Sequence, residues 1–578
     1  MPCLSFTSHQ QSQPDGSSEE RTQSRHREQS AVLSFTGADA ADEGQQQRPR
    51  KLDPSSYAEL ILWHAKTNAS NSLYQGQDWR DLVDWLNRAS IPCTVSLSKP
   101  GFAWIYVLPH NPPRQTVRGS ELSLPLCDTL QLSPSDGNVL IFLRGYPSPE
   151  WLKEIGARFN IDPEAFYRHL TFFHQRVALM RQAPFKLPSS QRSIFQLNLT
   201  TVGQYASARG DSLSKIRAYA AREMERYKVG MRNPTCWGLG NSIVRSFDVH
   251  NESVFSLEQL VTIYVSKESE DSPWITLVWL DSGDDLLQSP VGPWSNIGQQ
   301  RSTTTFPVTM YKRSISLKHQ HHRLVETEFN DVHGSKGLPQ SISLLPLFYG
   351  RSLNATQMSE DPLYALHELL LFWATSETQF LNVVSSGLRS TVDLSPERFP
   401  SKMVDIQNTL VFYKDILNRH TNLISDVFEF FENRELLDWP RSQANKPQLM
   451  AQRLEYDVKY LLGKSKALQQ QCESSMNTIM NQAGLQEAKR AVSESERIYR
   501  LSVLVSVFIP LSFCSSLFSM SFVNFQQTHT GIWTFFSLTI PIFAFSLTLF
   551  NWNPDKFRKY VRNPKLWSKR TQLEPVGA

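Results

Sequence analysis

The sequence predicts an α/β (α+β) N-terminal domain, a long α-helical stalk and two C-terminal transmembrane helices. Three observations lead to this fold class. Residues 501–554 contain no Asp, Glu, Lys or Arg, although 20% of the 578 residues are charged. Residues 448–500 contain no proline and are rich in strong helix formers. Before residue 358, short β-branched runs alternate with helix-start patterns, as in mixed α/β folds.

Composition excludes several classes of protein. The net charge is only +4, which is too small for the global basic field of a nucleic-acid-binding protein. The six cysteines form no CxxC pair, which argues against a disulfide scaffold or a zinc ribbon and favours a reducing compartment. The sequence contains no Gly-rich phosphate loop, GxSxG elbow or zinc-hydrolase motif, so we predict no enzyme.

The first 358 residues divide into a tail and a domain. Residues 1–55 are polar and poor in large apolar residues, so we expect a disordered tail without a secretory signal. Residues 56–358 are predicted to form a cytosolic α/β domain, in which Ser148-Pro149 and Asp162-Pro163 start helices. Further helices are expected at Tyr57–Lys66 and Trp79–Ala89, and strands at Cys93–Leu97, Phe102–Leu108, Val139–Leu143, Ser193–Leu199, Phe255–Val265 and Trp274–Leu280, the last two as a hairpin.

Residues 359–500 form a helical region. Asp361-Pro362 opens one helix that ends near Gly387, and Ser401 to about Glu435 is a second. A third helix begins near Gln448. If it continues into the apolar segment it spans about 70 residues, or roughly 105 Å, a length that suits a stalk leading into a membrane.

Two apolar segments of membrane-spanning length follow the stalk. We assign residues 501–521 and 532–552 as transmembrane helices 1 and 2, residues 522–531 as a short outer loop, and residues 553–578 as a basic cytosolic tail. Basic residues flank both spans on the side away from the loop, so the positive-inside rule places both termini in the cytosol. The plasma membrane is the default because no organelle address is present. The flanking basic residues are Arg497, Arg500, Lys556, Arg558, Lys559, Arg562 and Lys565.

One face of the first span is rich in hydroxyl groups. At about 100° per residue, six positions fall within an arc of about 140°. Two interpretations stay open: close helix–helix packing through small residues, or a pore-lining face. The pore-lining interpretation requires several copies around an axis, because one hairpin cannot enclose a pathway. The six positions are Ser502, Ser506, Ile509, Ser512, Ser516 and Ser519.

Residues from about 90 to 565 resemble, in order, the CorA/ZntB superfamily of divalent-cation transporters. The most specific elements are the run from Phe142 to Leu152 and the run from Ile498 to Phe513. The closest likeness is to divergent fungal-type CorA-like members. The resemblance implies a homopentamer whose first span, with Ser502, Ser506, Ile509, Ser512 and Ser516, lines the pore.

The resemblance also implies an outer mouth for selectivity. Where the family has aromatic-Gly-Met-Asn, this chain has Phe518, Ser519, Met520 and Ser521, a degenerate form of the motif. In the family the Asn ring holds a hydrated magnesium ion; here Ser521 presents hydroxyl groups, and nearby Asn524 offers an amide. The outer loop carries no carboxylate that would concentrate cations.

Two further clusters are candidates for binding metal in the cytosol. Asp281, Asp284 and Asp285 follow a predicted strand and supply the oxygen ligands that hard cations prefer; the alternative is an ordinary acidic turn, since the spacing of a calcium loop is absent. A histidine-rich patch is either a solvated loop or a weak soft-metal site, and its members are His319, His321, His322 and His333.

These observations together predict a CorA-like transporter that passes hydrated divalent cations, magnesium first, through a homo-oligomeric pore. No resident cofactor is expected; Mg²⁺ is the expected transported and regulatory ion, and the partners are the cation, the lipid membrane and further copies of the chain. Two alternatives stay open. The first is a transport-inactive membrane scaffold or sensor, which the altered Ser519-Met520-Ser521 would suit. The second is a zinc- or nickel-selective relative, which His529 at the mouth would support.

Overall fold

The structure is a computed structural model. It describes residues 53–68, 76–88, 101–108, 119–124, 126, 137–170, 193–205, 212–231, 237–267, 269, 272–287, 289–295, 303–308, 340–392, 399–519 and 531–550. All of these belong to one unit, Leu52–Ala578. The predicted strand Cys93–Leu97, the histidine-rich patch, the outer loop and both terminal tails lie outside the described residues.

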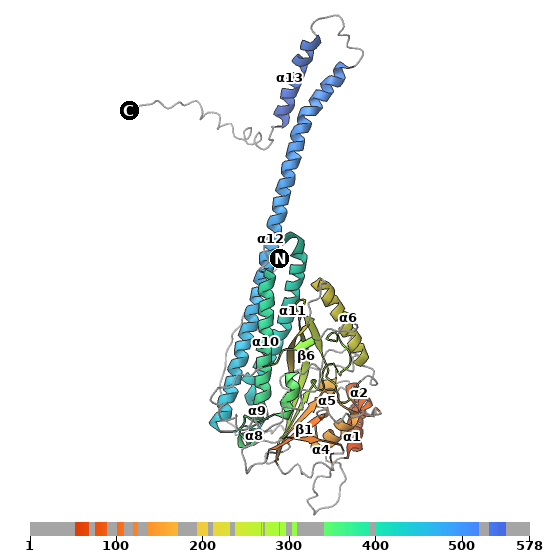
Figure 1. The fold of residues 1–578 in the computed structure, drawn as a ribbon, viewed down its shortest axis with the longest axis vertical. Helices are drawn as coiled ribbons and strands as arrows, with labels where there is room; N and C mark the ends of the chain where they lie inside the picture. Colours follow the sequence, from red (N-terminus) through yellow and green to blue (C-terminus); the bar gives the residue numbers. More distant parts are fainter. Residues whose placement is uncertain are drawn as a thin grey trace, which may run out of the picture. The chain divides into compact units, whose positions relative to one another are not determined.

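A mixed sheet of eight strands forms the centre of the N-terminal domain (Figure 1). Its order is β2-β1-β3-β7-β6-β4-β8, with β5 also paired to β6. Strands β3 and β7 are parallel, whereas β6 and β7 form the predicted antiparallel hairpin. The strands are β1 (Ala103–Leu108), β2 (Gly119–Leu122), β3 (Asn138–Arg144), β4 (Ile194–Tyr205), β5 (Ser246–Val249), β6 (Val254–Ser266), β7 (Ile275–Leu280) and β8 (Thr303–Thr305).

Helices cover both faces of this sheet, so its central strands are apolar on both sides. In β3, Ile141 and Leu143 point into one hydrophobic core, while Leu140 and Phe142 point into the other. The first core is shared with α1 (Pro54–Asn68), α2 (Gly76–Leu86), α4 (Pro149–Phe159), α5 (Pro163–Leu170) and α6 (Leu213–Met231). The second core is shared with η6 (Ser341–Leu347), α8 (Ala355–Glu360), α9 (Pro362–Ala365) and the three long helices described below.

Capping fixes where several helices begin. Ser148 accepts a hydrogen bond from the Trp151 N–H, and Pro149 occupies the first turn of α4, so the predicted helix start is confirmed. Asp361 caps α9 in the same way. The predicted single helix from Asp361 is divided in the structure, because α9 ends at Ala365 and α10 begins at His367.

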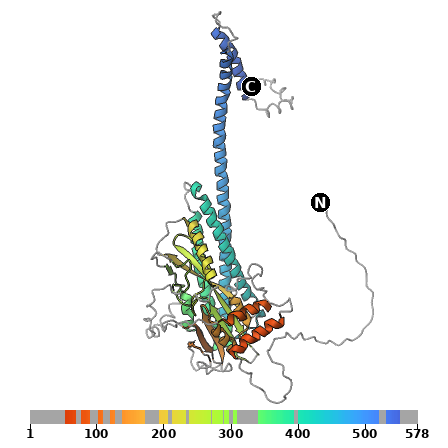
Figure 2. The same cartoon turned by 90° about the vertical axis from the view of Figure 1, so that its right-hand side faces the viewer.

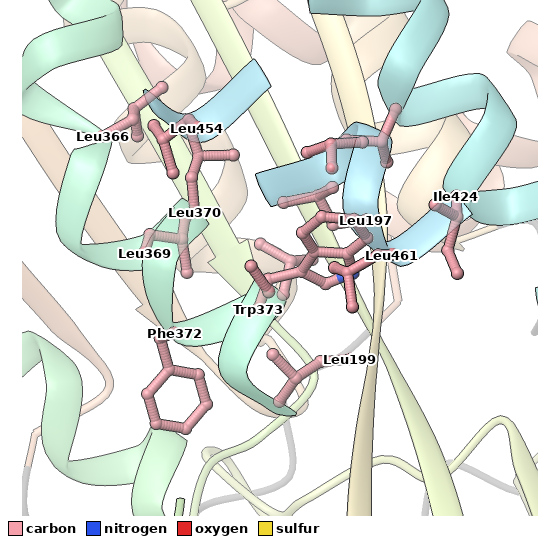
Figure 3. Packing of buried hydrophobic residues seen from close by; sticks show 14 of the residues in the cluster. Leu197, Leu199, Leu366, Leu369, Leu370, Phe372, Trp373, Ile424, Leu454 and Leu461 are labelled. Atoms are coloured by element: carbon pink, nitrogen blue, oxygen red, sulfur yellow. The ribbon is translucent and has the colours of Figure 1, made fainter. Parts of the chain in front are cut away.

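Three long helices pack on the second face of the sheet: α10 (His367–Val392), α11 (Phe399–Glu432) and α12 (Asn445–Phe518). Figure 3 shows leucines and Trp373 from α10, β4 and α12 meeting in one core. Between Leu454 and Cys472, buried residues of α12 recur every three or four positions, as in a coiled coil. Helices α11 and α12 are antiparallel, since Thr421 contacts Ser465 (2.5 Å) and Lys414 contacts Glu473 (3.3 Å).

Helix α12 is the predicted long helix, and its length is confirmed. It contains 74 residues, about 111 Å at 1.5 Å per residue, and Figure 2 shows it as one uninterrupted ribbon. Its last buried residue in the bundle is Ile479. From Glu487 to Leu501 every residue is exposed. We call residues 480–500 the stalk segment.

Several elements were not predicted from the sequence, among them β2, β5 and α6. The two strands have only four residues each, too few to show a pattern. Helix α6 does carry a signal, because its buried residues Ile216, Ala220, Met224, Tyr227 and Met231 recur at helical spacing.

Candidate ion pathway

The end of α12 and the following helix α13 (Gly531–Phe550) form an apolar pair. By length and composition, α12 is the one helix among the described residues that could cross a membrane, and Trp533–Ser546 within α13 is a shorter apolar stretch. Between residues 501 and 554 neither helix carries a charged side chain, so no charge opposes burial of this part in lipid.

The two helices pack antiparallel along one side of α12. The Ser546 hydroxyl donates a hydrogen bond to the Ser506 carbonyl (3.3 Å), and the rings of Phe518 and Phe535 are 5.3 Å apart. Pro510 and Cys514 of α12 are buried. Contacts near both ends of the paired segments therefore define the side of α12 that faces α13.

Packing against α13 divides the predicted pore-lining residues. Ser502 and Ser506 are half-buried on the α13 side, and the Ser506 hydroxyl donates to the Ser502 carbonyl within its own helix. Ile509, Ser512, Ser516 and Ser519 are exposed. Leu501 and Val505, which the sequence did not single out, continue this exposed face toward the stalk. We call Leu501, Val505, Ile509, Ser512, Ser516 and Ser519 the open stripe.

The chemistry of the open stripe is neutral and changes along its length. Leu501, Val505 and Ile509 are apolar, whereas Ser512, Ser516 and Ser519 present hydroxyl groups. Hydroxyl groups can hydrogen-bond to water around an ion but compensate poorly for the loss of that water. Phe518 contacts α13, and Met520, Ser521, Asn524 and His529 lie outside the described residues.

The carboxylates that the sequence marked as candidate metal ligands are engaged within the N-terminal domain. Asp281 is buried, 2.6 Å from the Arg245 guanidinium and 2.9 Å from His169 Nε2. Burial alone would raise the pKa of Asp281, but Arg245 and His169 lower it to about 2. Asp284 is buried, and Asp285 accepts a hydrogen bond from the Leu287 N–H. Within the described part of the chain, no group of three His, Cys, Asp or Glu residues is placed to hold a metal.

A buried charge network joins the sheet to helices α10 and α11. His420 of α11 lies 2.6 Å from Glu377 of α10 and 3.2 Å from Glu258 of β6, and the three side chains are at most 5% exposed. Arg419 donates hydrogen bonds to Glu258 and to Asp248 of β5, both at 2.6 Å. Local sequence gives no sign of this network, because its members are far apart along the chain.

The network predicts a loss of stability at high pH. Burial alone would lower the pKa of His420, but Glu377 and Glu258 raise it to about 10. Against an unfolded pKa of about 6.5, protonated His420 stabilises the fold fully below about 6.5, and this contribution disappears as the pH rises through about 10. Thermal unfolding between pH 7 and 11 should show the loss. His420→Gln should remove this part of the pH dependence; identical profiles for the two proteins would contradict the assignment.

Residues 389–552 match the family model for CorA-like Mg²⁺ transporter protein. The matched residues comprise the end of α10, α11, α12 and α13. The chain is also similar to the complete structure of the CorA magnesium transporter from Methanocaldococcus jannaschii, with 11% identity, a TM-score of 0.33 and coverage of 78% of this chain and 98% of that chain. No curated protein matches the sequence.

Proposed function

We propose that this membrane protein conducts hydrated divalent cations, with magnesium as the main ion, through a homo-oligomeric pore. The proposal starts from the match of residues 389–552 to the CorA-like family. The matched family is one of transporters, which supports transport as the function of this segment. The observation that carries the proposal is the open stripe: an exposed, uncharged face on a membrane-length helix, pointing away from α13.

The open stripe needs further copies of the chain to become a pathway. One pair of helices leaves Leu501, Ile509, Ser512 and Ser516 exposed, and hydroxyl groups facing lipid would lose their hydrogen bonds to water. A ring of α12 helices with α13 on the outside places the stripe on the axis. The family resemblance suggests five copies.

The lining favours ions that keep their water. Magnesium dehydrates more reluctantly than calcium, and the stripe has no carboxylate that would replace its hydration shell. In the proposed pore, Ser512, Ser516 and Ser519 contact the water around the ion, and Met520, Ser521 and Asn524 complete the outer mouth. The basic residues that flank both spans support cytosolic termini, and the plasma membrane is the membrane that we propose.

Flux into liposomes that hold the purified protein and an ion-sensitive dye tests this function. Mg²⁺ and Zn²⁺ are added separately, and the expected result is Mg²⁺ entry. Entry of Zn²⁺ alone would identify a zinc-selective relative. Absence of flux for both ions, from protein shown to be an intact oligomer, would overturn the transport proposal in favour of a membrane scaffold.

Cysteine variants test which face of α12 lines the pore. Ser512→Cys on the open stripe should be blocked by a cationic thiol reagent, because the added charge enters the path. The matched control is Ser502→Cys, which lies half-buried against α13 and should conduct with little change. Wild-type protein treated with the reagent controls for Cys514 and the other native thiols. Block of flux in Ser502→Cys but not in Ser512→Cys would contradict the assignment of the open stripe as the pore lining.

A further inference from the structure

A second apolar stripe lies on the stalk segment, on a different side from the open stripe. Leu485, Ala488, Val492, Ser495 and Tyr499 are spaced alternately by three and four residues and fall within an arc of about 80°. All five are exposed; Leu485, Val492 and Tyr499 are 60–64% exposed. We call these five residues the stalk stripe. Three large apolar side chains in register on a helix are the usual mark of a packing surface.

The stalk stripe continues the face that α13 covers in the membrane-length part of α12. Steps of three, four and four residues lead from Tyr499 to Ser502, Ser506 and Pro510, which are half-buried or buried beside α13. By helical geometry this face lies about 130° round α12 from the open stripe. In a ring with the open stripe on the axis, the stalk stripe therefore points outward, and neighbouring stalks do not cover it.

The chain itself emerges on this side. The contact between Ser546 and Ser506 fixes the antiparallel register of the two helices. The end of α13, Phe550, is then opposite Ser502, because each lies four residues from that contact. The stalk stripe begins three residues further along α12, at Tyr499.

We infer that the C-terminal tail, residues 551–578, packs along the stalk stripe of its own chain. The stripe spans 15 residues, from 485 to 499, or about 21 Å between its two ends. The tail of 28 residues is long enough to cover it even when folded back. The tail carries the large aromatic side chains Tyr560 and Trp567. Burying two aromatic side chains against this stripe supplies the contact.

The charges of the tail suggest an alternative binding place for it, the lipid surface. It contains seven Lys and Arg residues and two acidic residues, so anionic lipid headgroups would also attract it. On the stalk, Glu496 is exposed at the border of the stripe and offers a carboxylate. If apolar contacts hold the tail, it binds the stalk stripe. If only its charges hold it, it stays on the lipid surface.

A photo-crosslinker distinguishes these locations without any measurement of flux. The full chain, reconstituted in bilayers, carries p-benzoylphenylalanine in place of Val492, and crosslinked peptides are identified by mass spectrometry. We expect crosslinks to residues 551–578. The matched control replaces Glu494, two residues further on and on the opposite side of the helix, and should not capture the tail. Capture of lipid or of another copy from position 492, without the tail, would overturn the inference.

Proteolysis of the assembled protein provides a second test. Val492→Asp should raise the rate of tryptic cleavage in the Lys/Arg-rich tail by about tenfold or more, since it removes one buried apolar side chain from the contact. Glu494→Asp is the control and should leave the rate unchanged. Equal cleavage rates in Val492→Asp and wild type would also overturn the inference. In the crosslinking experiment, mixing isotope-labelled and unlabelled copies shows whether the captured tail belongs to the same chain. Capture of a tail from another copy would contradict the inference.

Discussion

Ser516→Lys is expected to abolish cation flux, with a drop of at least about a hundredfold. Residue 516 lies on the open stripe, exposed and away from α13. A lysine ammonium about 8 Å from a divalent ion, at an effective dielectric constant of about 20, raises the energy of the ion by about 4 kcal/mol. Each subunit of an oligomer adds such a charge. Flux of Mg²⁺ into dye-loaded liposomes measures the effect.

The control for this variant is Ser516→Gln, which adds a side chain of similar length without a charge. We expect it to keep much more flux than Ser516→Lys. Equal losses in the two variants would mean steric block instead of electrostatic repulsion. Normal flux in Ser516→Lys, from protein that remains an intact oligomer, would contradict the placement of residue 516 in the path.

Glu258→Ala is expected to lower the free energy of unfolding by about 3–5 kcal/mol, the usual cost of removing one partner from a buried ion pair. Glu258 contacts both Arg419 and His420, and its side chain is 5% exposed. Burial alone would raise the pKa of Glu258, but His420 and Arg419 lower it, so the carboxylate is held in its charged form. Its removal leaves two cationic side chains short of a partner.

The matched control is Glu473→Ala. Glu473 also pairs across a helix contact, with Lys414 at 3.3 Å, but both side chains are at least 40% exposed. Solvent screens such a pair, so its loss should cost less than about 1 kcal/mol. Denaturant unfolding followed by tryptophan fluorescence compares the two variants with wild type. A cost for Glu258→Ala no larger than for Glu473→Ala would show that the network does not stabilise the fold.

Patterns that repeat along the chain were readable from the sequence. The uncharged run after residue 500, the proline-free stretch before it and the strands around Val139 and Phe255 are all local signals, because burial in a helix or strand repeats at a fixed period. They predicted the mixed α/β domain, the long helix α12 and the β6–β7 hairpin. Periodicity also identified a hydroxyl-rich face on the first apolar segment.

Contacts between distant residues were decided by the tertiary structure alone. The sequence could not show that α13 covers Ser502 and Ser506. For the same reason it could not show that Leu501 and Val505 belong to the exposed face of α12. It marked Asp281 as a candidate metal ligand, whereas the fold pairs it with Arg245 and His169. Glu258, Glu377 and His420 carry no common motif. A periodic pattern specifies that a side of a helix is covered, but only packing determines which neighbour covers it.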